Sequence, residues 1–193
     1  MTQQDIISSL FTEARTHRAF SARMVETDLL KQIYQTARFA PTASNLNPLR
    51  VSFVVSEAEK AKVIEAAAAG NKSKIESAPV VAIMAYDTEF YRYTSQLAPH
   101  MNADSFAAQS PEVLQKIAIE NSWLQAGAFL IAARAHGLDC GPMSGFDNQA
   151  IDSSFYAEGS WRSLFLMNMG YGDTEQLYPR GDRLSFDDAC ALL

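Results

Sequence analysis

"WLQAGAFLIAARA", residues 123–135, is apolar almost all the way round. It forms the middle of a helix that the sequence predicts from Pro111 to Gly137. A helix with apolar side chains on every face is expected to be buried on several sides. We therefore expect this helix to be central, either in the core of one chain or in the contact between two copies.

Further helices and strands are predicted on both sides of this helix. Runs of β-branched and aromatic residues predict strands, and apolar residues at helical spacing predict helices. The predicted strands cover residues 49–55, 80–86, a short stretch near 138–143, and 163–171. The predicted helices cover residues 5–15, 29–40, 57–70, 146–155 and 184–193. Residues 87–111 show no clear periodicity and suit a loop-rich excursion that forms a lid or reaches a partner.

Local signals mark the ends of several of these helices. Pro41 is expected to end the second helix and Gly70 to stop the third. The expected N-terminal caps are Thr27 with Asp28, Asp147, and Ser185.

Length and composition indicate one globular unit. The chain has 193 residues, of which 48% are hydrophobic and 20% charged, so it is long enough to bury a core. No repeat, linker or shift in composition divides it, and residues 1–193 are expected to form one domain. The mixture of helices and strands indicates an α/β or α+β fold, which by itself specifies no function.

The charge balance and the targeting signals exclude several classes of partner. The net charge of -6, from 16 basic and 22 acidic residues, is opposite to that of a protein that neutralises nucleic-acid phosphates. The N-terminus carries no secretory pattern, and no apolar run reaches membrane-spanning length. Two widely spaced cysteines, Cys140 and Cys190, are typical of a reducing compartment. We expect a soluble, cytoplasmic protein with no nucleic-acid or membrane partner.

Metal and nucleotide motifs are missing from the sequence. His17, His100 and His136 are scattered and lack the paired spacing of a metal site, so no metal is expected. No G-x-G-x-x-G follows the first strand and no phosphate-loop motif occurs, which disfavours a dinucleotide-binding fold.

Residues 141–147, GPMSGFD, come close to the G-x-S-x-G motif of serine hydrolases, but the glycines are one residue out of register with Ser144. A hydrolase with Ser144 as nucleophile and His136 or His100 as base is therefore a minor alternative. The favoured interpretation is a turn between strand and helix whose backbone amides point outward and can serve a ligand.

Two earlier stretches are rich in polar ligand-binding groups. ARTHRAF, residues 14–20, brings Arg15 and Arg18 together with Thr16 and His17, a set that could hold a phosphate. Two arginines at a helix end can also simply complement the helix dipole. APTASNLNP, residues 40–48, holds two asparagines, two prolines, a serine and a threonine, which could equally satisfy loop backbone groups.

Taken together, these three stretches resemble the nitroreductase family of flavin enzymes. That family carries R-R-S-x-R-x-F near its N-terminus, then A-P-S-S-x-N-x-Q-P before a strand, and later P-x-x-G-F-D, which here is Pro142–Asp147. The resemblance spans residues 10–193. The sequence resembles one subgroup more closely still, the malonic semialdehyde reductases of uracil degradation, through RTH, EFY at 89–91, GLD-x-GPMSGFD, N-x-GYGD and the final RLSF segment.

The resemblance implies a fold and an assembly. It implies an α+β protein, a three-layer α/β/α sandwich with a central mixed, mainly antiparallel sheet. It also implies a domain-entwined homodimer with FMN at the subunit interface, where both chains line each site. The helix at 111–137 is the segment we assign to that interface.

The resemblance also implies which residues bind FMN. Arg15, Thr16, His17 and Arg18 would lie at the phosphate and ribityl end, although the first arginine of the family motif is Ala14 here. The residues expected to assist them are Arg180 and Arg183.

The flavin ring would be bound by two other segments. Asn45 would hydrogen-bond the pyrimidine edge, because an amide offers both a donor and an acceptor, while Asn47 replaces the usual glutamine. The rest of this wall would be Pro41, Thr42, Ala43 and Ser44. On the other side, Pro142 and Met143 would pack against the ring, and the backbone N–H groups of Ser144 and Gly145 would lie by flavin N5.

The implied reaction is a ping-pong hydride transfer, from NADH or NADPH through FMN to a small oxidant. Malonic semialdehyde, reduced to 3-hydroxypropanoate, is the expected oxidant, and Arg18 is the hypothetical partner of its carboxylate. Arg18 could instead be a surface arginine paired with a glutamate. An NAD(P)H-dependent nitroaromatic or quinone reductase and a non-catalytic flavin-binding protein are the alternatives.

Overall fold

One antiparallel sheet organises the chain. The computed structural model describes residues 2–193. Its strands are β1 (Leu49–Val54), β2 (Val80–Asp87), β3 (Asp139–Met143) and β4 (Trp161–Gly170). They lie in the order β1-β2-β4-β3, and every neighbouring pair is antiparallel. One isolated parallel bridge joins Thr16 to Cys140 beside β3. The predicted strands are confirmed, with small shifts at their ends.

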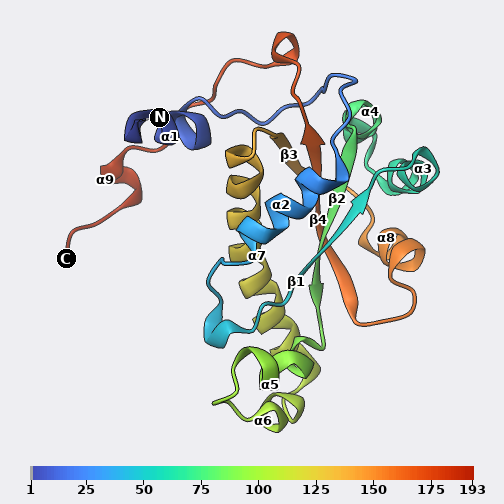
Figure 1. The fold of residues 1–193 in the computed structure, drawn as a ribbon, viewed down its shortest axis with the longest axis vertical. Coiled ribbons are helices and arrows are strands. Elements are labelled where there is room, and N and C mark those ends of the chain that lie inside the picture. The colour runs from blue at the N-terminus through green and yellow to red at the C-terminus, as the bar shows by residue number, and fades with distance from the viewer. Residues whose placement is uncertain (1) are drawn as a thin grey trace.

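Helices cover both faces of this sheet and give three layers (Figure 1). On one face lie α2 (Thr27–Ala37) and α7 (Pro111–Ala135). On the other lie α3 (Glu57–Ala66), α4 (Ala69–Ser77) and α8 (Asn148–Phe155). Because both faces are covered, all eight residues of β2 are buried. The expected three-layer α+β sandwich is therefore confirmed.

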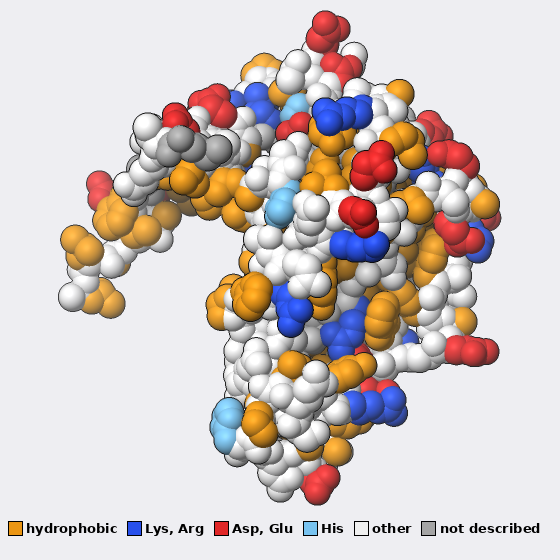
Figure 2. Space-filling model, in the orientation of Figure 1, with side chains coloured by type: hydrophobic (Ala, Val, Ile, Leu, Met, Phe, Trp, Pro, Cys, Tyr) orange, Lys and Arg blue, Asp and Glu red, His pale blue; other side chains and the backbone are white. Residues whose placement is uncertain are grey.

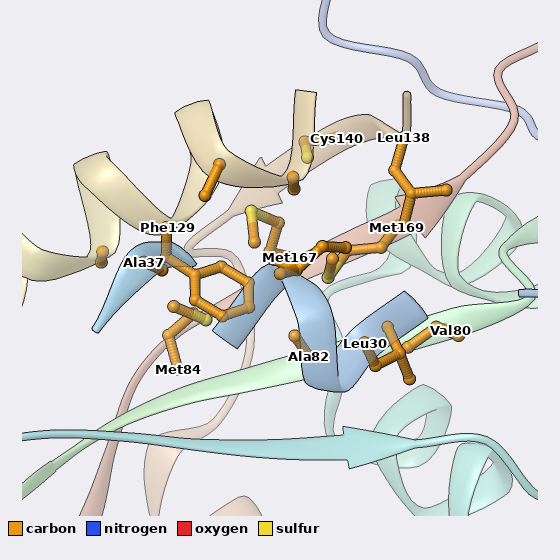
Figure 3. Packing of buried hydrophobic residues seen from close by; sticks show 14 of the residues in the cluster. Leu30, Ala37, Val80, Ala82, Met84, Phe129, Leu138, Cys140, Met167 and Met169 are labelled. Atoms are coloured by element: carbon orange, nitrogen blue, oxygen red, sulfur yellow. The ribbon is translucent and has the colours of Figure 1, made fainter. Parts of the chain in front are cut away.

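The larger core cluster lies between the sheet and the α2–α7 layer. Phe129 of α7 points at Met84 and Met167 of the sheet, and Leu30 of α2 closes the cluster from the side (Figure 3). Cys140 also belongs to this cluster, and burial raises the pKa of its thiol to about 12. Such a thiol stays protonated and inert at neutral pH.

α7 is buried on one side only within a single chain. Ala126 and Phe129 face the sheet and are buried, whereas Trp123 and Leu124 are 49% and 54% exposed. The prediction that this helix is buried on several sides is thus confirmed only for the side that faces the sheet. Its exposed side could contact another copy of the chain.

Three expected helix ends differ from the structure. The first helical segment consists of α1 (Gln3–Ile7) and a π-helical turn at Ser8–Thr12, so it ends before residue 15. α2 begins at Thr27 with Glu26 in the cap position, and no side chain caps it. The expected stop at Gly70 is wrong, because α3 ends at Ala66 and Gly70 lies inside α4.

Two of the expected N-terminal caps are confirmed. Asp147 and Ser185 cap their helices by accepting backbone hydrogen bonds. The helix at Ser185 is short, since α9 covers only Phe186–Ala189. Residues 87–111 contain a 3-10 turn at Phe90–Tyr93 and the two short helices α5 (Thr94–Leu97) and α6 (Ala103–Ala107).

The two ends of the chain form an arm that stands away from the sheet. α1 and α9 both belong to this arm (Figure 1), and hydrophobic side chains run along the arm in Figure 2. None of residues 171–193 is buried. Leu184 and Phe186 are 75% and 60% exposed, so this tail has no core of its own. Among the described residues, no helix combines the length and the apolarity needed to cross a bilayer.

Candidate functional site

A cationic cavity of about 420 Å³ lies where the N-terminal segment, α4, the end of β3 and the C-terminal tail meet. It brings together eight of the residues predicted to bind FMN. These are Arg15, Thr16, His17, Arg18, Pro142, Met143, Arg180 and Arg183. Segments more than 160 residues apart in the chain therefore line one cavity.

Two glycines let the N-terminal segment reach this position. A Cβ atom on Gly141 would lie 2.6 Å from the carbonyl oxygen of His17, and one on Gly172 would lie 2.0 Å from its ring Nδ1. Backbone bridges from Thr16 to Cys140 and from Phe20 to Gly172 hold the segment on both sides of the histidine. Only glycine permits backbone and ring to approach this closely.

His17 is buried at 5% exposure, although its neighbours line the cavity more openly. Its Nε2 lies 3.4 Å from Asp139 Oδ1, and the other carboxylate oxygen of Asp139 accepts a hydrogen bond from the Gly172 amide at 2.8 Å. Nδ1 has no partner within the described part of the chain. The ring therefore anchors the segment that carries Arg15 and Arg18.

Five cations and no carboxylate line the cavity. The cations are Arg15, Arg18, Lys74, Arg180 and Arg183. None of them forms an ion pair within residues 2–193. In a chain with a net charge of -6 this is a concentrated positive site, and it suits a phosphate.

The cations are held by neutral groups. Arg15 donates to the carbonyl oxygen of Tyr178, and Arg180 donates to that of Ala14 at 2.9 Å. The guanidinium of Arg18 stacks on the Tyr178 ring, 4.4 Å from its centroid. No glutamate pairs with Arg18 in the described residues, so the alternative of a surface ion pair gains no support.

Ser144 and Gly145 follow the cavity wall formed by Pro142 and Met143 but do not line the cavity themselves. The carbonyl oxygen of Gly145 accepts hydrogen bonds from the Ala68 amide at 2.9 Å and from Asn71 Nδ2 at 3.0 Å. Their own N–H groups donate to no other group within the described chain. The turn is therefore fixed while two amides stay available to a ligand.

The same geometry bears on the serine-hydrolase alternative. No histidine hydrogen-bonds Ser144 within the described residues, and His136 contacts Thr36 at 2.8 Å on the α2–α7 side. The hydrolase hypothesis gains no support.

The sequence interpretation missed the contribution of α4. Lys74 lines the cavity and donates to Asn71 Oδ1 at 3.0 Å. The sequence predicts a helix end at Gly70 and no further helix before the second strand, whereas the structure places Lys74 inside α4. The sequence signal for a cation at this position was the polar run GNKSK at residues 70–74, which precedes the second strand.

The loop at residues 40–48, which contains Asn45 and Asn47 and is called the asparagine loop below, lies elsewhere in the same chain. Asn45 and Asn47 line a second cavity of about 990 Å³ between α2, β1 and residues 93–97. Phe39, Tyr93 and Trp161 make much of its wall aromatic. The structure thus does not bring the two predicted walls of the flavin site together within one chain.

The other residues of that wall, Pro41, Thr42, Ala43 and Ser44, line neither cavity. Ser44, Asn45 and Asn47 have φ angles of 49°, 56° and 46°. Non-glycine residues seldom adopt this left-handed region, and asparagine tolerates it better than most.

Comparison with known proteins identifies the family. The model of the nitroreductase family matches residues 12–171. The chain belongs to the nitroreductase family. It is 46% identical over 187 residues to a protein of Rhodopseudomonas palustris provisionally named NADH dehydrogenase/NAD(P)H nitroreductase, covering 97% of this chain and 95% of that one. A Ralstonia nicotianae protein of the same kind is 42% identical over 191 residues, covering 99% and 98%.

Solved nitroreductases share the fold. A Bacillus subtilis protein superposes with a TM-score of 0.88 at 22% identity, covering 99% of this chain and 100% of that one. An Exiguobacterium sibiricum protein, solved in complex with FMN, has a TM-score of 0.83 at 20% identity, covering 100% and 98%. The predicted family and fold are confirmed.

We predict that Gly172→Ala destabilises this nitroreductase-family protein, because the added methyl group would overlap the buried His17 ring. Overpacking of this kind costs on the order of 1–3 kcal/mol, which thermal or urea unfolding would measure. Gly70→Ala is the control, since nothing lies within 4 Å of its Cβ position. Equal stability of Gly172→Ala and the wild type would show that the ring can move aside.

Proposed function

We propose that the chain is an FMN-dependent NAD(P)H oxidoreductase whose principal oxidant is malonic semialdehyde, reduced to 3-hydroxypropanoate. The observation that carries the proposal is the cavity with five cations, no carboxylate and two available backbone amides beside it. FMN presents a phosphate, a flat apolar ring and a polar edge, and these groups match the cations, the Pro142–Met143 wall and the amides. Membership of the nitroreductase family and the names of its NAD(P)H-linked relatives support FMN and NAD(P)H.

Each group on the chain would have a separate task. Arg15, Arg180 and Arg183 would bind the phosphate, and Pro142 and Met143 would pack against the ring. The N–H groups of Ser144 and Gly145 would donate to the ring where charge develops, which stabilises the reduced state without an acidic side chain. When bound, FMN supplies the hydride chemistry between NAD(P)H and the oxidant.

We further infer a homodimer in which the partner completes each site. The asparagine loop and the cationic cavity are separate within one chain. This separation is expected if each flavin site is formed by one wall from each of two chains. The exposed side of α7 and the tail at 171–193 offer apolar surface for such an entwined contact. The two free cysteines are consistent with a cytoplasmic location.

The anionic substrate is supported by Arg18. Its guanidinium lines the cavity, is half-buried and has no carboxylate partner among the described residues. A carboxylate on a small aldehyde would satisfy that charge. A nitroaromatic or quinone reductase is the second candidate, favoured by the names of the relatives and by the aromatic wall of the larger cavity.

We predict that the purified protein is yellow, with flavin close to equimolar with the chain. NAD(P)H oxidation is expected to have a higher kcat/KM with malonic semialdehyde than with a nitroaromatic compound or a quinone. The opposite order would favour the second candidate. Flavin without any NAD(P)H turnover would indicate a non-catalytic binding protein, and a colourless protein that cannot be reconstituted with FMN would overturn the proposal.

We predict that Arg18→Ala weakens the use of malonic semialdehyde selectively. Loss of one charged hydrogen bond should raise its KM on the order of 10- to 100-fold. The KM for a neutral aldehyde should stay unchanged. Arg23→Ala is a matched control, because Arg23 also stacks on a tyrosine, Tyr171 at 3.7 Å, but lines neither cavity. Equal losses with both aldehydes would exclude the carboxylate contact.

We predict that Arg15→Glu and Asn45→Ala complement each other in mixed dimers. If the two walls come from different chains, a mixed dimer holds one intact site and one site with both changes. Mixed dimers purified through two different tags should then regain about half of the wild-type activity, whereas each variant alone stays impaired. Absence of any gain would place both walls in one chain.

A further inference from the structure

The asparagine loop needs support from outside itself. Three of its residues, Ser44, Asn45 and Asn47, are in the left-handed region without being glycine. Such backbone persists only where the surrounding structure fixes it, and it is concentrated at functional sites. The contacts that fix this loop therefore bear on what the loop does.

Two buried amide side chains of α7 make those contacts. Asn121 Oδ1 accepts a hydrogen bond from the Ala43 amide at 2.7 Å, at the start of the loop. Gln125 Oε1 accepts one from the Leu49 amide at 3.0 Å, at its end. The two residues are four positions apart, so they lie on the same face of the helix. Both ends of the loop are thus tied to one turn of α7.

These amides lie among apolar neighbours. Asn121 and Gln125 are 9% and 6% exposed, and Ala118, Ala126 and Phe129 share their side of the helix. A buried amide is costly unless it is hydrogen-bonded. The loop backbone donates to the oxygens of both amides, Asn121 Nδ2 donates to the Ile117 carbonyl oxygen of α7 at 2.9 Å, and Gln125 Nε2 donates to the Asn47 side chain. These hydrogen bonds remove the cost, so helix and loop depend on each other.

A chain of side-chain amides continues from α7 to the predicted flavin ligand. Gln125 Nε2 donates to Asn47 Oδ1 at 3.1 Å. Asn47 Nδ2 then donates to Asn45 Oδ1 at 2.8 Å and to the Asn45 carbonyl oxygen at 2.7 Å. Asn45 Nδ2 donates to the carbonyl oxygen of Leu97 at 2.8 Å. Each amide orients the next, and Asn45 keeps a second N–H and a second lone pair for a ligand.

We propose that Asn121 and Gln125 are positioning residues of the flavin site, which fix the left-handed loop and the direction of the Asn45 amide. This inference rests on the proposed function, because it assigns Asn45 to the flavin. Gln125 acts through Asn47, and Asn121 acts through the backbone at Ala43. Neither side chain needs to touch the cofactor.

Gln125→Met and Asn121→Leu test the proposal, since each keeps the size of the side chain and removes its polar atoms. We expect about tenfold weaker FMN binding in either variant and a shift of the bound-flavin absorption band. Ser122→Ala is the matched control. Ser122 is fully buried on the same helix, and its hydroxyl has no partner among the described residues, so FMN binding and spectrum should not change.

A double-mutant comparison separates positioning from stability. In an Asn47→Ala background the link from Gln125 to Asn45 is already broken, so Gln125→Met should add little further change in the flavin spectrum. If Gln125→Met does not fold, Asn47→Ala alone can be used in its place. The same weakening of FMN binding and the same shift of the flavin absorption band are then expected. The inference would be overturned if the variants bound FMN as tightly as the wild type, with identical flavin spectra, and differed only in a lower thermal stability. That result would leave the proposed function standing. A wild type that binds no FMN would instead overturn the proposed function.

Discussion

The close contact between His17 and two glycines is the constraint on which the cationic cavity depends. The His17 carbonyl lies where a Cβ of Gly141 would be, and its ring lies where a Cβ of Gly172 would be. Asp139 holds the ring from the side. With that contact, the N-terminal segment lies against β3 and β4 and presents its arginines to the tail and to α4. A larger residue at Gly141 would overlap the backbone of His17, and one at Gly172 would overlap its ring, so either change would disturb this contact.

The strands could be predicted because their signals are local. Residues 49–55, 80–86 and 163–171 are rich in β-branched and aromatic side chains, and they became β1, β2 and β4. The end of α3 could not be predicted in this way, because an alanine run carries no stop signal. Ala67 pairs with Phe146, and the Ala68 amide donates to Gly145, so distant residues end the helix. Tertiary contacts thus decided the break that local propensity placed at Gly70.

Several residues predicted to bind FMN could be selected from the sequence, but periodicity and spacing did not show which of them would line one cavity. Similarity of motifs selected Arg15, Arg18, Pro142 and Arg180, and these line one cavity. The same similarity selected Asn45, which lines another. The order of residues along the sequence does not show which groups come together within one chain and which would come together only between two chains. Lys74 was missed for a separate reason, because it lies on α4 and no helix was predicted between Gly70 and the second strand.

α7 connects the core, the loop and the outer surface. Its apolar pattern predicted a central helix, but periodicity could not show that Gln125 would be buried and Trp123 left half-exposed. Trp123 stacks flat on Phe165 of β4, with 4.7 Å between ring centroids, and about half of the residue stays exposed. Gln125, two residues later, supports the asparagine loop. A second copy that packed on Trp123 would contact the same helix that supports this loop. Assembly and the geometry of the site would then be coupled through α7.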